Sequence, residues 1–594
     1  MICRTVGPGW DGQVGNFGPQ SLWLFGFGFG HTGAGVFMWF KSKNRRLLEP
    51  DEVFMDSTNL PDFDTQQFEG QLERPITKTM FYLVGVLTVL ASLAMAGRAV
   101  DLQITRGAEF NQLSIDNTLR QIVIFPERGV IYDRIGIELA WNDGAGRAYV
   151  PGGGFGHLLG YVSYPREEEI ATSGYHPKSY IGRAGAERAF NRLLGGRSGL
   201  KVEEVNVQGQ ISSDYLYQAP EDGQGLKLSI DSRIQTKLFE TIKNLSLEKG
   251  FTGGAGLIMD VRTGQLLAAT SYPEYDSNVL SRGQDRAAIS GYLNDASKPF
   301  LNRIVDGLYT PGSTVKPIMA LGALAEKVIS PDKEILSTGA LTVPNPYFPD
   351  QPSVFKDWKA HGLVNMERAL AMSSNVYFYE IGGGYEDQRG IGISGIEKYA
   401  RLFGLGQPIE FELGSSASGV IPTPAWKAKQ FAGEPWRLGD TYHTVIGQYG
   451  FQVTPLHMVR MMAAIANGGK LLMPSVQYDL RPEEIKFTNL PFLADDFEIV
   501  RRGLRRGVEE GTGMGLSVPY VQVAAKTGTA ELGVEKTETS SWALGFFPYE
   551  APRYAFAVVM ERGPKENLVG GVYVMRQMLD WLHAEASDYL QPSF

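Results

Sequence analysis

The chain has 594 residues, a formal net charge of −9 and a hydrophobic content of 43%. This length exceeds what one hydrophobic core usually organises, so we expect two or more domains. The acidic balance leaves no basic stripe for nucleic acid, and we expect no nucleic-acid partner. The sequence has one cysteine, Cys3, which excludes an intrachain disulfide and a cysteine-based metal cluster.

Residues 1–78 precede the first long apolar run. The first 40 residues are rich in Gly, Phe and Trp, and a true start at Met38 would place the basic cluster at residues 41–46 close to the N-terminus. Residues 49–78 are acidic and poor in apolar side chains, which is typical of a disordered segment. We expect residues 1–78 to form a disordered cytoplasmic tail.

Residues 79–97 contain no charged side chain and are bounded by Lys78 and Arg98. As a helix this run would be roughly 28 Å long, close to the roughly 30 Å hydrocarbon core of a bilayer. A cleaved signal peptide or a buried helix would fit the same composition, but the long preceding tail favours a single transmembrane anchor. The basic cluster before it favours a cytoplasmic N-terminus, which would make the rest of the chain extracytoplasmic.

Residues 98–225 alternate short strand-like runs with glycine-rich turns. This pattern predicts an extended, strand-rich pedestal and not a second enzyme core. Four charged residues in it have the signs needed for a set of structural ion pairs. They are Arg128, Asp133, Arg134 and Glu187.

From residue 226 onward the pattern is that of a new core. Short apolar runs between turns predict strands, and longer runs with apolar residues at helical spacing predict helices. We therefore expect residues 226–594 to form an α+β domain, with helices on both faces of a mainly antiparallel central sheet. Strands are predicted at residues 226–231, 255–261, 265–270, 521–525 and 555–559, and a helix at 455–465.

Three short motifs follow one another in this domain: Ser313-x-x-Lys316, Ser373-x-Asn375 and Lys526-Thr-Gly-Thr529. A helix that starts at Ser313 would place Lys316 on the same face one turn later, so that a base lies beside a nucleophile. The serine would also lie at the positive end of the helix dipole. Other Ser-x-x-Lys matches occur, but this one alone joins a Pro-Gly turn to an apolar helix.

These motifs, in this order, are the signature of penicillin-recognising serine acyltransferases. The chain resembles the class B penicillin-binding proteins over roughly residues 79–585, and it resembles their elongation type in particular. The resemblance implies the transpeptidase fold for residues 226–594 and a pedestal or dimerisation domain for residues 98–225. Segments that carry it besides the three motifs are residues 128–136, 182–187, 194–199, 356–361, 424–427 and 435–441.

The resemblance also implies a role for each residue of the motifs. Ser313 would be the nucleophile and Lys316 its base, neutral because it is buried and lies near a second cation, Lys526. Ser373 would relay the proton to the leaving group, and Asn375 would bind the substrate peptide.

The third motif would supply the substrate wall. We expect it at the end of a strand that begins near Val521, where Gly528 leaves room for an extended peptide. Thr527 and Thr529 would bind a terminal carboxylate, and the backbone N–H groups of Ser313 and Thr529 would form the oxyanion hole.

Two features depart from the family or remain open. His457 stands where the family usually has glutamine, and Tyr449 where it usually has glycine. Some relatives carry zinc near the Asp-Trp segment, but here Asp357 and His361 supply two ligands and no cysteine. We expect these two residues to be a solvated or hydrogen-bonded pair, with no metal and no cofactor.

The function that the resemblance implies is D,D-transpeptidation of peptidoglycan stem peptides by a single-pass protein of the bacterial cell membrane, inhibited by β-lactams. A lipid-linked precursor, a SEDS-type glycosyltransferase and cell-shape proteins would be its partners. A β-lactamase or D,D-carboxypeptidase is an alternative, and so is a penicillin-binding sensor or scaffold. The pedestal and the anchor argue against a hydrolase, and the short N-terminal tail argues against a sensor.

Overall fold

The structure is a computed structural model that describes residues 77–591, except 145, 174, 206–209, 346, 347, 349 and 534. Most of the predicted tail, the alternative start at Met38 and the basic cluster at 41–46 therefore lie outside the described residues. The chain divides into two compact units, residues 1–105 and residues 106–594, which we describe separately.

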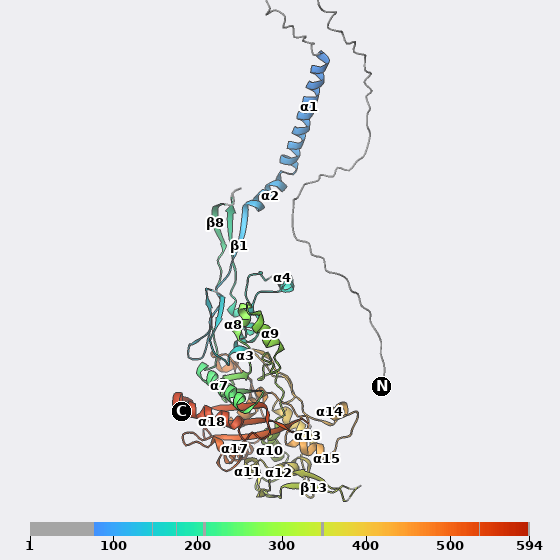
Figure 1. Cartoon of the computed structure of the whole chain (residues 1–594), viewed down its shortest axis with the longest axis vertical. Coiled ribbons are helices and arrows are strands. Elements are labelled where there is room, and N and C mark those ends of the chain that lie inside the picture. The colour runs from blue at the N-terminus through green and yellow to red at the C-terminus, as the bar shows by residue number, and fades with distance from the viewer. Residues whose placement is uncertain are drawn as a thin grey trace, which may run out of the picture. The chain divides into compact units, whose positions relative to one another are not determined.

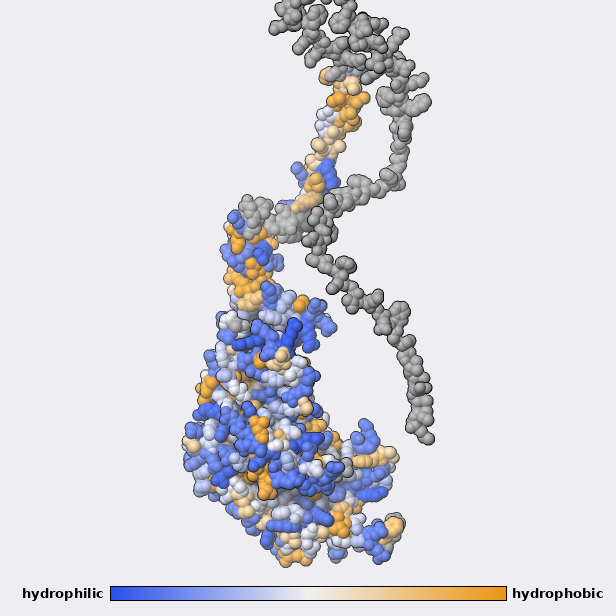
Figure 2. All heavy atoms as spheres, viewed as in Figure 1, coloured by the Kyte–Doolittle hydropathy of each residue, from blue (hydrophilic) through white to orange (hydrophobic). Residues whose placement is uncertain are grey.

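The described part of the first unit is one long apolar helix, α1 (Lys78–Val100), followed by a short π-helical segment, η2 (Asp101–Thr105). α1 contains the whole uncharged run 79–97, none of its residues is buried, and apolar side chains cover it in Figure 2. A helix that is apolar on all sides requires an apolar environment. In the described part of the chain it is the one helix long and apolar enough to cross a membrane.

The N-terminal part of the second unit is rich in short strands, as predicted for the pedestal. Three strands, β1, β7 and β8, form one antiparallel sheet, and β4, β3, β2 and β9 form another in which β2 and β9 run parallel. The elements of this part are α2 (Gly107–Thr118), β1 (Leu119–Ile124), β2 (Ile131–Tyr132), β3 (Glu138–Asp143), β4 (Gly146–Tyr149), α3 (Gly156–Leu159), β5 (Val162–Ser163), α4 (Glu167–Ser173), β6 (Ile181–Gly182), α5 (Gly185–Ala189), α6 (Asn191–Leu194), β7 (Gly199–Val205), β8 (Ile211–Gln218) and β9 (Leu226–Lys227).

One buried carboxylate, Glu187, joins the segments of the pedestal. It pairs with Arg128 at 2.6 Å, as predicted, and also with Arg147 at 2.7 Å, which the sequence did not single out. The other two residues of the predicted set are not part of it. Asp133 accepts hydrogen bonds from two backbone amides and Ser232, and Arg134 lies over the rings of Tyr478 and Tyr589.

The core of the second unit is a five-stranded sheet in which every neighbouring pair is antiparallel. The predicted hairpin forms its first two strands and the predicted run 555–559 lies in its third, but of the predicted run 521–525 only Ala524 and Ala525 belong to a strand. The prediction for residues 226–231 was too long, because only Leu226 and Lys227 pair as a strand. In spatial order the strands are β11 (Leu266–Tyr272), β10 (Gly253–Asp260), β22 (Tyr554–Pro564), β21 (Glu538–Phe547) and β20 (Ala524–Leu532).

Both faces of this sheet are covered by helices (Figure 1). Side chains alternate between the faces, so Leu257 and Met259 enter one hydrophobic cluster while Ile258 enters the other. Helices α7 (Ser232–Lys249) and α18 (Gly571–Glu585) cover one face, and α16 (Pro455–Ala466) and α10 (Lys316–Ala325) belong to the cluster on the other face. This arrangement confirms the predicted α+β architecture.

The remaining elements surround this core. They are α8 (Ser277–Arg282), α9 (Arg286–Asn294), η3 (Gly312–Val315), β12 (Ile335–Ser337), β13 (Ala340–Val343), β14 (Ser353–Lys356), β15 (Gly362–Val364), α11 (Met366–Met372), α12 (Asn375–Gly383), α13 (Gly392–Leu402), β16 (Glu410–Phe411), β17 (Gly414–Ser415), α14 (Pro424–Gln430), α15 (Leu438–Val445), β18 (Lys470–Leu472), η4 (Pro482–Glu484), β19 (Phe487–Asn489), α17 (Ala494–Glu509), η5 (Met514–Leu516) and η6 (Ser587–Leu590).

Candidate active site

The three sequence motifs meet at one cavity of about 450 Å³. Segments far apart in the sequence form its walls: the turn before α10, the turn between α11 and α12, and strand β20. Lys316 and Lys526 are buried within the domain. The residues that line the cavity are Ser313, Trp358, Ser373, Asn375, Thr512, Thr527, Gly528, Thr529, Ser541, Trp542, Leu568, Gly570 and Val572.

Ser313 lies in a tight 3-10 turn, η3, and α10 begins at Lys316. The predicted helix start is therefore correct in position, but its first turn is 3-10 and not α-helical. Gly312 has a φ of +54°, which glycine adopts without strain, and its N–H donates to Gly447 O at 3.0 Å. The turn is held from its other end by Thr314 Oγ1, which donates to Pro311 O at 2.7 Å.

The Lys316 amine points to the second motif. Its Nζ donates to Ser373 O and to Asn375 Oδ1, each at 2.7 Å, and lies 3.4 Å from Ser373 Oγ. The side chains of Lys316 and Ser313, both described, form no hydrogen bond with each other, although the two residues are one helical turn apart. The lysine is thus held by the second motif, while Ser313 Oγ remains available on the cavity side.

Burial changes the charge state of both lysines. The pKa of Lys316 lies well below its ordinary value, first because the amine is fully buried and second because Lys526 repels its charge. The negative charge of Asp357 opposes this shift. Burial also lowers the pKa of Lys526 to about 7, so this lysine carries only part of its charge at neutral pH.

The second motif forms the junction of two helices. Ser373 ends α11 in the left-handed region with φ +56°, a conformation that costs a non-glycine residue energy, and Ser374 is the N-cap of α12. This sharp change of direction places the Ser373 carbonyl and the Asn375 side chain beside the same amine. The capping function and the site geometry therefore occur together in one turn.

The third motif lies in the middle of strand β20, which begins at Ala524. The prediction that it would end a strand beginning near Val521 was wrong, because pairing with β21 starts only at Ala524 and continues to Leu532. A Cβ atom on Gly528 would lie 2.6 Å from Thr314 Cγ2 and 2.8 Å from Pro311 O. Glycine at this position allows β20 to contact the turn that carries Ser313.

Seven residues that line the cavity were not predicted as part of the site: Trp358, Thr512, Ser541, Trp542, Leu568, Gly570 and Val572. Thr512 accepts a hydrogen bond from Thr527 Oγ1 at 2.6 Å, and Trp358 and Leu568 expose large apolar side chains at the rim. Trp358 belongs to the Asp-Trp segment that the sequence did single out. For Thr512 and Leu568 the sequence carries no motif that marks them.

The Asp-Trp segment does not fit a zinc site. Asp357 Oδ2 already accepts hydrogen bonds from Ser337, Ser374, Asn375 and Val376, and the nearest imidazole nitrogen, His361 Nε2, is 3.6 Å from Oδ1. Within residues 77–591, apart from the gaps given above, no three His, Cys, Asp or Glu side chains gather as metal ligands. The residues present are arranged as a hydrogen-bonded carboxylate.

The two departures from the family pattern lie on different parts of the domain. His457 is buried in the first turn of α16, where its ring nitrogens contact Thr454 Oγ1 and Gln407 O, each at 2.7 Å. Tyr449 adopts φ +62° and contacts the rings of Trp426, Phe431 and Trp436. His457 is therefore a structural residue, while Tyr449 forms part of an aromatic cluster.

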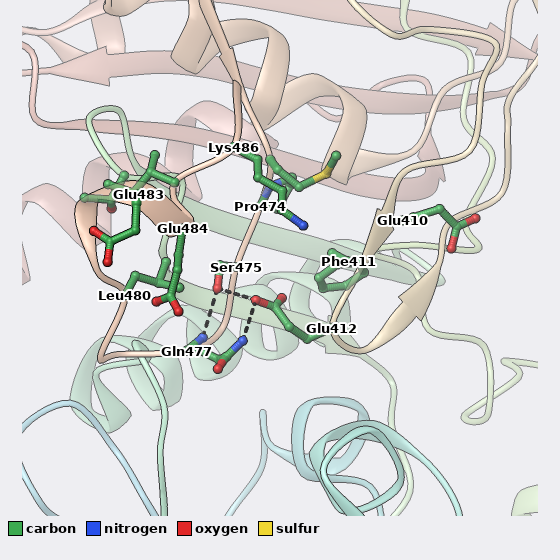
Figure 3. A pocket seen from close by; sticks show the side chains of 13 residues that line it. Glu410, Phe411, Glu412, Pro474, Ser475, Gln477, Leu480, Glu483, Glu484 and Lys486 are labelled. Atoms are coloured by element: carbon green, nitrogen blue, oxygen red, sulfur yellow. Dashed lines mark hydrogen bonds between the residues drawn. The ribbon is translucent and has the colours of Figure 1, made fainter. Parts of the chain in front are cut away.

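Figure 3 shows a second cavity, of about 580 Å³, which no residue of the three motifs lines. Four glutamates line it: Glu410, Glu412, Glu483 and Glu484. Its lysine, Lys486, is exposed, and the hydroxyl of Ser475 donates to Glu412. It lacks a buried amine like those of Lys316 and Lys526, so the first cavity is the candidate active site.

Comparison with known proteins agrees with this geometry. Residues 254–575 match the family described as penicillin binding protein transpeptidase domain, and residues 138–228 match the penicillin-binding protein dimerisation domain. The chain is 29% identical to the peptidoglycan D,D-transpeptidase MrdA of Acinetobacter baumannii over 70% of this chain and 63% of the relative. It is 26% identical to MrdA of Escherichia coli over 85% of this chain and 94% of the relative.

A solved structure shows the same fold. The complex between PBP2 and MreC from Helicobacter pylori contains a chain that aligns with a TM-score of 0.68 and 25% identity, over 79% of this chain and all of that one. The fold, the cavity and the matched residues define a serine acyltransferase of the penicillin-recognising class, and the chain belongs to the penicillin-binding protein transpeptidase family. Within that family it is a class B protein of the PBP2 (MrdA) type, an elongation-associated peptidoglycan D,D-transpeptidase.

Proposed function

We propose that this enzyme forms its acyl intermediate on Ser313, with Lys316 as the base that accepts the serine proton. The observation that carries the proposal is the position of the Lys316 amine, fully buried and held by Ser373 and Asn375 beside the cavity that Ser313 lines. A neutral amine has two hydrogens and one lone pair. Its two short hydrogen bonds use both hydrogens, which leaves the lone pair free for a proton.

Ser373 and Lys526 complete the proposed acid–base set. Ser373 Oγ lies 3.4 Å from the Lys316 amine, within reach of a proton that passes from Lys316 to the leaving D-alanine. Lys526 acts through its charge, which lowers the pKa of Lys316 and attracts the carboxylate of the substrate. Because the pKa of Lys526 is about 7, this contribution is present below pH 7 and is lost as the pH rises through 7.

The donor peptide would bind along β20. This strand is at the edge of the sheet, with β21 as its one strand neighbour among the described residues. An edge strand offers unpaired N–H and C=O groups, so an extended stem peptide can add to it by backbone hydrogen bonds. Thr527 and Thr529 would bind its terminal carboxylate, and the N–H groups of Ser313 and Thr529 would bind the oxyanion.

The setting of the enzyme is also a proposal. We propose that α1 anchors the chain in the bacterial cell membrane, with residues 1–78 as the cytoplasmic tail and the catalytic domain outside. We keep the division into a pedestal at residues 98–225 and a transpeptidase domain at 226–594, which the two family matches support. The relative from Helicobacter pylori forms a complex with MreC. A cell-shape protein of that kind and a SEDS-type polymerase acting on the lipid-linked precursor are the proposed partners.

Mass spectrometry of the full-length protein in detergent tests the assignment. Benzylpenicillin should add to a tryptic peptide that contains Ser313, the adduct should persist, and Ser313→Ala should abolish it. An adduct on another serine would show that the nucleophile is assigned incorrectly. Rapid turnover of the antibiotic would instead favour a β-lactamase.

A further inference from the structure

One buried carboxylate holds the beginning of the helix that carries Asn375. Asp357 Oδ2 accepts hydrogen bonds from Ser374 Oγ at 2.8 Å and from the N–H groups of Asn375 at 2.8 Å and Val376 at 3.1 Å. These residues are the N-cap and the first two positions of α12, whose amides have no partner within the helix. A carboxylate at this end also interacts favourably with the helix dipole.

The same carboxylate holds a second segment that lines the cavity. Asp357 Oδ2 accepts a further hydrogen bond from Ser337 Oγ at 3.2 Å, and Oδ1 accepts one from the Trp358 N–H at 2.9 Å. The Trp358 ring lines the cavity, and its Nε1 donates to Met372 O at 3.2 Å. Asp357 therefore connects the Trp358 segment with the turn between α11 and α12.

A continuous set of hydrogen bonds leads from this carboxylate to the proposed base. The backbone of Asn375 is bound by Asp357, and its side chain accepts from the Lys316 amine at 2.7 Å. We infer that Asp357 is a positioning residue of the transpeptidation reaction, which orients Asn375 and, through it and its own charge, prepares Lys316 for proton transfer. The inference rests on the proposed function, from which it takes the role of Lys316.

A purely structural helix cap would leave the base unaffected, so the charge of Asp357 is the deciding feature. The Asp357 side chain is completely buried, and its pKa lies below the ordinary value because backbone and side-chain donors and the charge of Lys316 outweigh the cost of burial. The charged or titratable groups around the pair are Lys526 from β20, His361 at 3.6 Å, Lys359 near His361, and Tyr379 from α12, whose pKa is raised by burial and by the charge of Asp357. Asp357 is the one of these that opposes the lowering of the Lys316 pKa.

The test compares Asp357→Asn with wild type in the full-length protein. We would measure the second-order rate constant of acylation by benzylpenicillin across the neutral and mildly acidic pH range. Misplacement of a catalytic group by about 1 Å can cost about 100-fold in rate, and we expect a loss of about 10- to 100-fold. Because the carboxylate raises the pKa of Lys316, the acidic limb of the pH profile should also move to lower pH.

Two variants serve as controls. Asp332→Asn makes the same change at an exposed turn and should leave the rate and the profile unchanged. Ser374→Ala removes one hydrogen bond to Asp357 but keeps its charge, so the rate should fall by about threefold or more while the limb stays in place. If Asp357→Asn does not fold, the Ser374→Ala rate tests the positioning of Asn375, and a wild-type rate overturns the inference.

A wild-type rate in Asp357→Asn or Ser374→Ala would overturn the inference. So would a slower Asp357→Asn enzyme with an unmoved acidic limb, because that result describes a structural cap alone. Ser313→Ala distinguishes a failure of the proposed function from a failure of the role assigned to Asp357. If that variant is still acylated, the proposed function fails, whatever the behaviour of Asp357.

Discussion

Replacing each of the two buried lysines by arginine separates their roles. Lys316 must be neutral to accept the proton of Ser313, whereas arginine keeps its charge at any pH at which the protein is folded. Lys526 is proposed to act through its charge, which arginine retains. We therefore expect Lys316→Arg to lose much more of the acylation rate than Lys526→Arg.

The size of the first effect follows from the charge states. A lysine with the ordinary pKa of 10.5 is neutral in about one molecule in 1,000 near pH 7.5, and burial and Lys526 increase that fraction. An arginine is neutral in fewer than about one molecule in 100,000. A general base typically contributes about 10²- to 10⁴-fold. We expect Lys316→Arg to reduce the acylation rate by about 10³-fold or more.

The loss of acylation rate in Lys526→Arg should come from packing alone, because arginine keeps the positive charge. Lys526 donates one described hydrogen bond, to Thr527 O at 2.9 Å, and arginine must fit into the same buried space. Overpacking a core site typically costs about 1–3 kcal/mol, which corresponds to about 5- to 150-fold if all of it is felt in the transition state. Above pH 7 the variant should lose less rate than wild type, because wild-type Lys526 loses its charge there.

Rapid-quench acylation by benzylpenicillin, followed by intact mass spectrometry, gives both rate constants. Lys243→Arg, on the exposed face of α7, is the matched control and should behave as wild type. Equal losses in the two variants, or a smaller loss in Lys316→Arg, would refute the assignment of the base.

Three further predictions concern stability, the turn at Ser313 and the anchor. Glu187→Gln leaves two buried arginines without their carboxylate and should destabilise the protein by about 3–5 kcal/mol, measured by thermal unfolding; an unchanged melting temperature would contradict this. Gly528→Ala should reduce acylation more than about tenfold because its Cβ clashes with Thr314, whereas Gly291→Ala, with free space in helix α9, should not. Deleting residues 1–105 should give a protein that needs no detergent and is still acylated; continued membrane partitioning would reveal a second anchor.

The sequence predicted the central sheet because each strand there carries its own pattern. The hairpin of β10 and β11 and the helix α16 are marked by local alternation and helical spacing, and the structure has them where expected. The strand predicted near Val521 was misplaced, because the apolar residues before Ala524 are buried without pairing. Apolar pattern reports burial, and pairing depends on a partner strand far along the chain.

The active site likewise shows that sequence pattern does not predict contacts between distant segments. Motif order singled out Ser313, Lys316, Ser373, Asn375 and Lys526, and the structure brings them to one cavity or directly behind it. The function of Asp357 could not be derived from spacing, since its partners come from β12, the Asp-Trp loop and α12. The partial loss of charge on Lys526 was also beyond the sequence, because it follows from complete burial.

The pairing of β10 with β22 has a consequence for folding during synthesis. These neighbouring strands at the centre of the sheet join Gly253 with Glu561 and Asp260 with Tyr554, so the middle of the sheet is made from two distant parts of the chain. During synthesis the β10–β11 hairpin, complete at Tyr272, must wait with two open edges until residues 273–553 and then β22 have emerged. Capacity to be labelled by penicillin should therefore appear only near the end of elongation. A nascent chain halted before β22 would hold all three motifs and yet be inert.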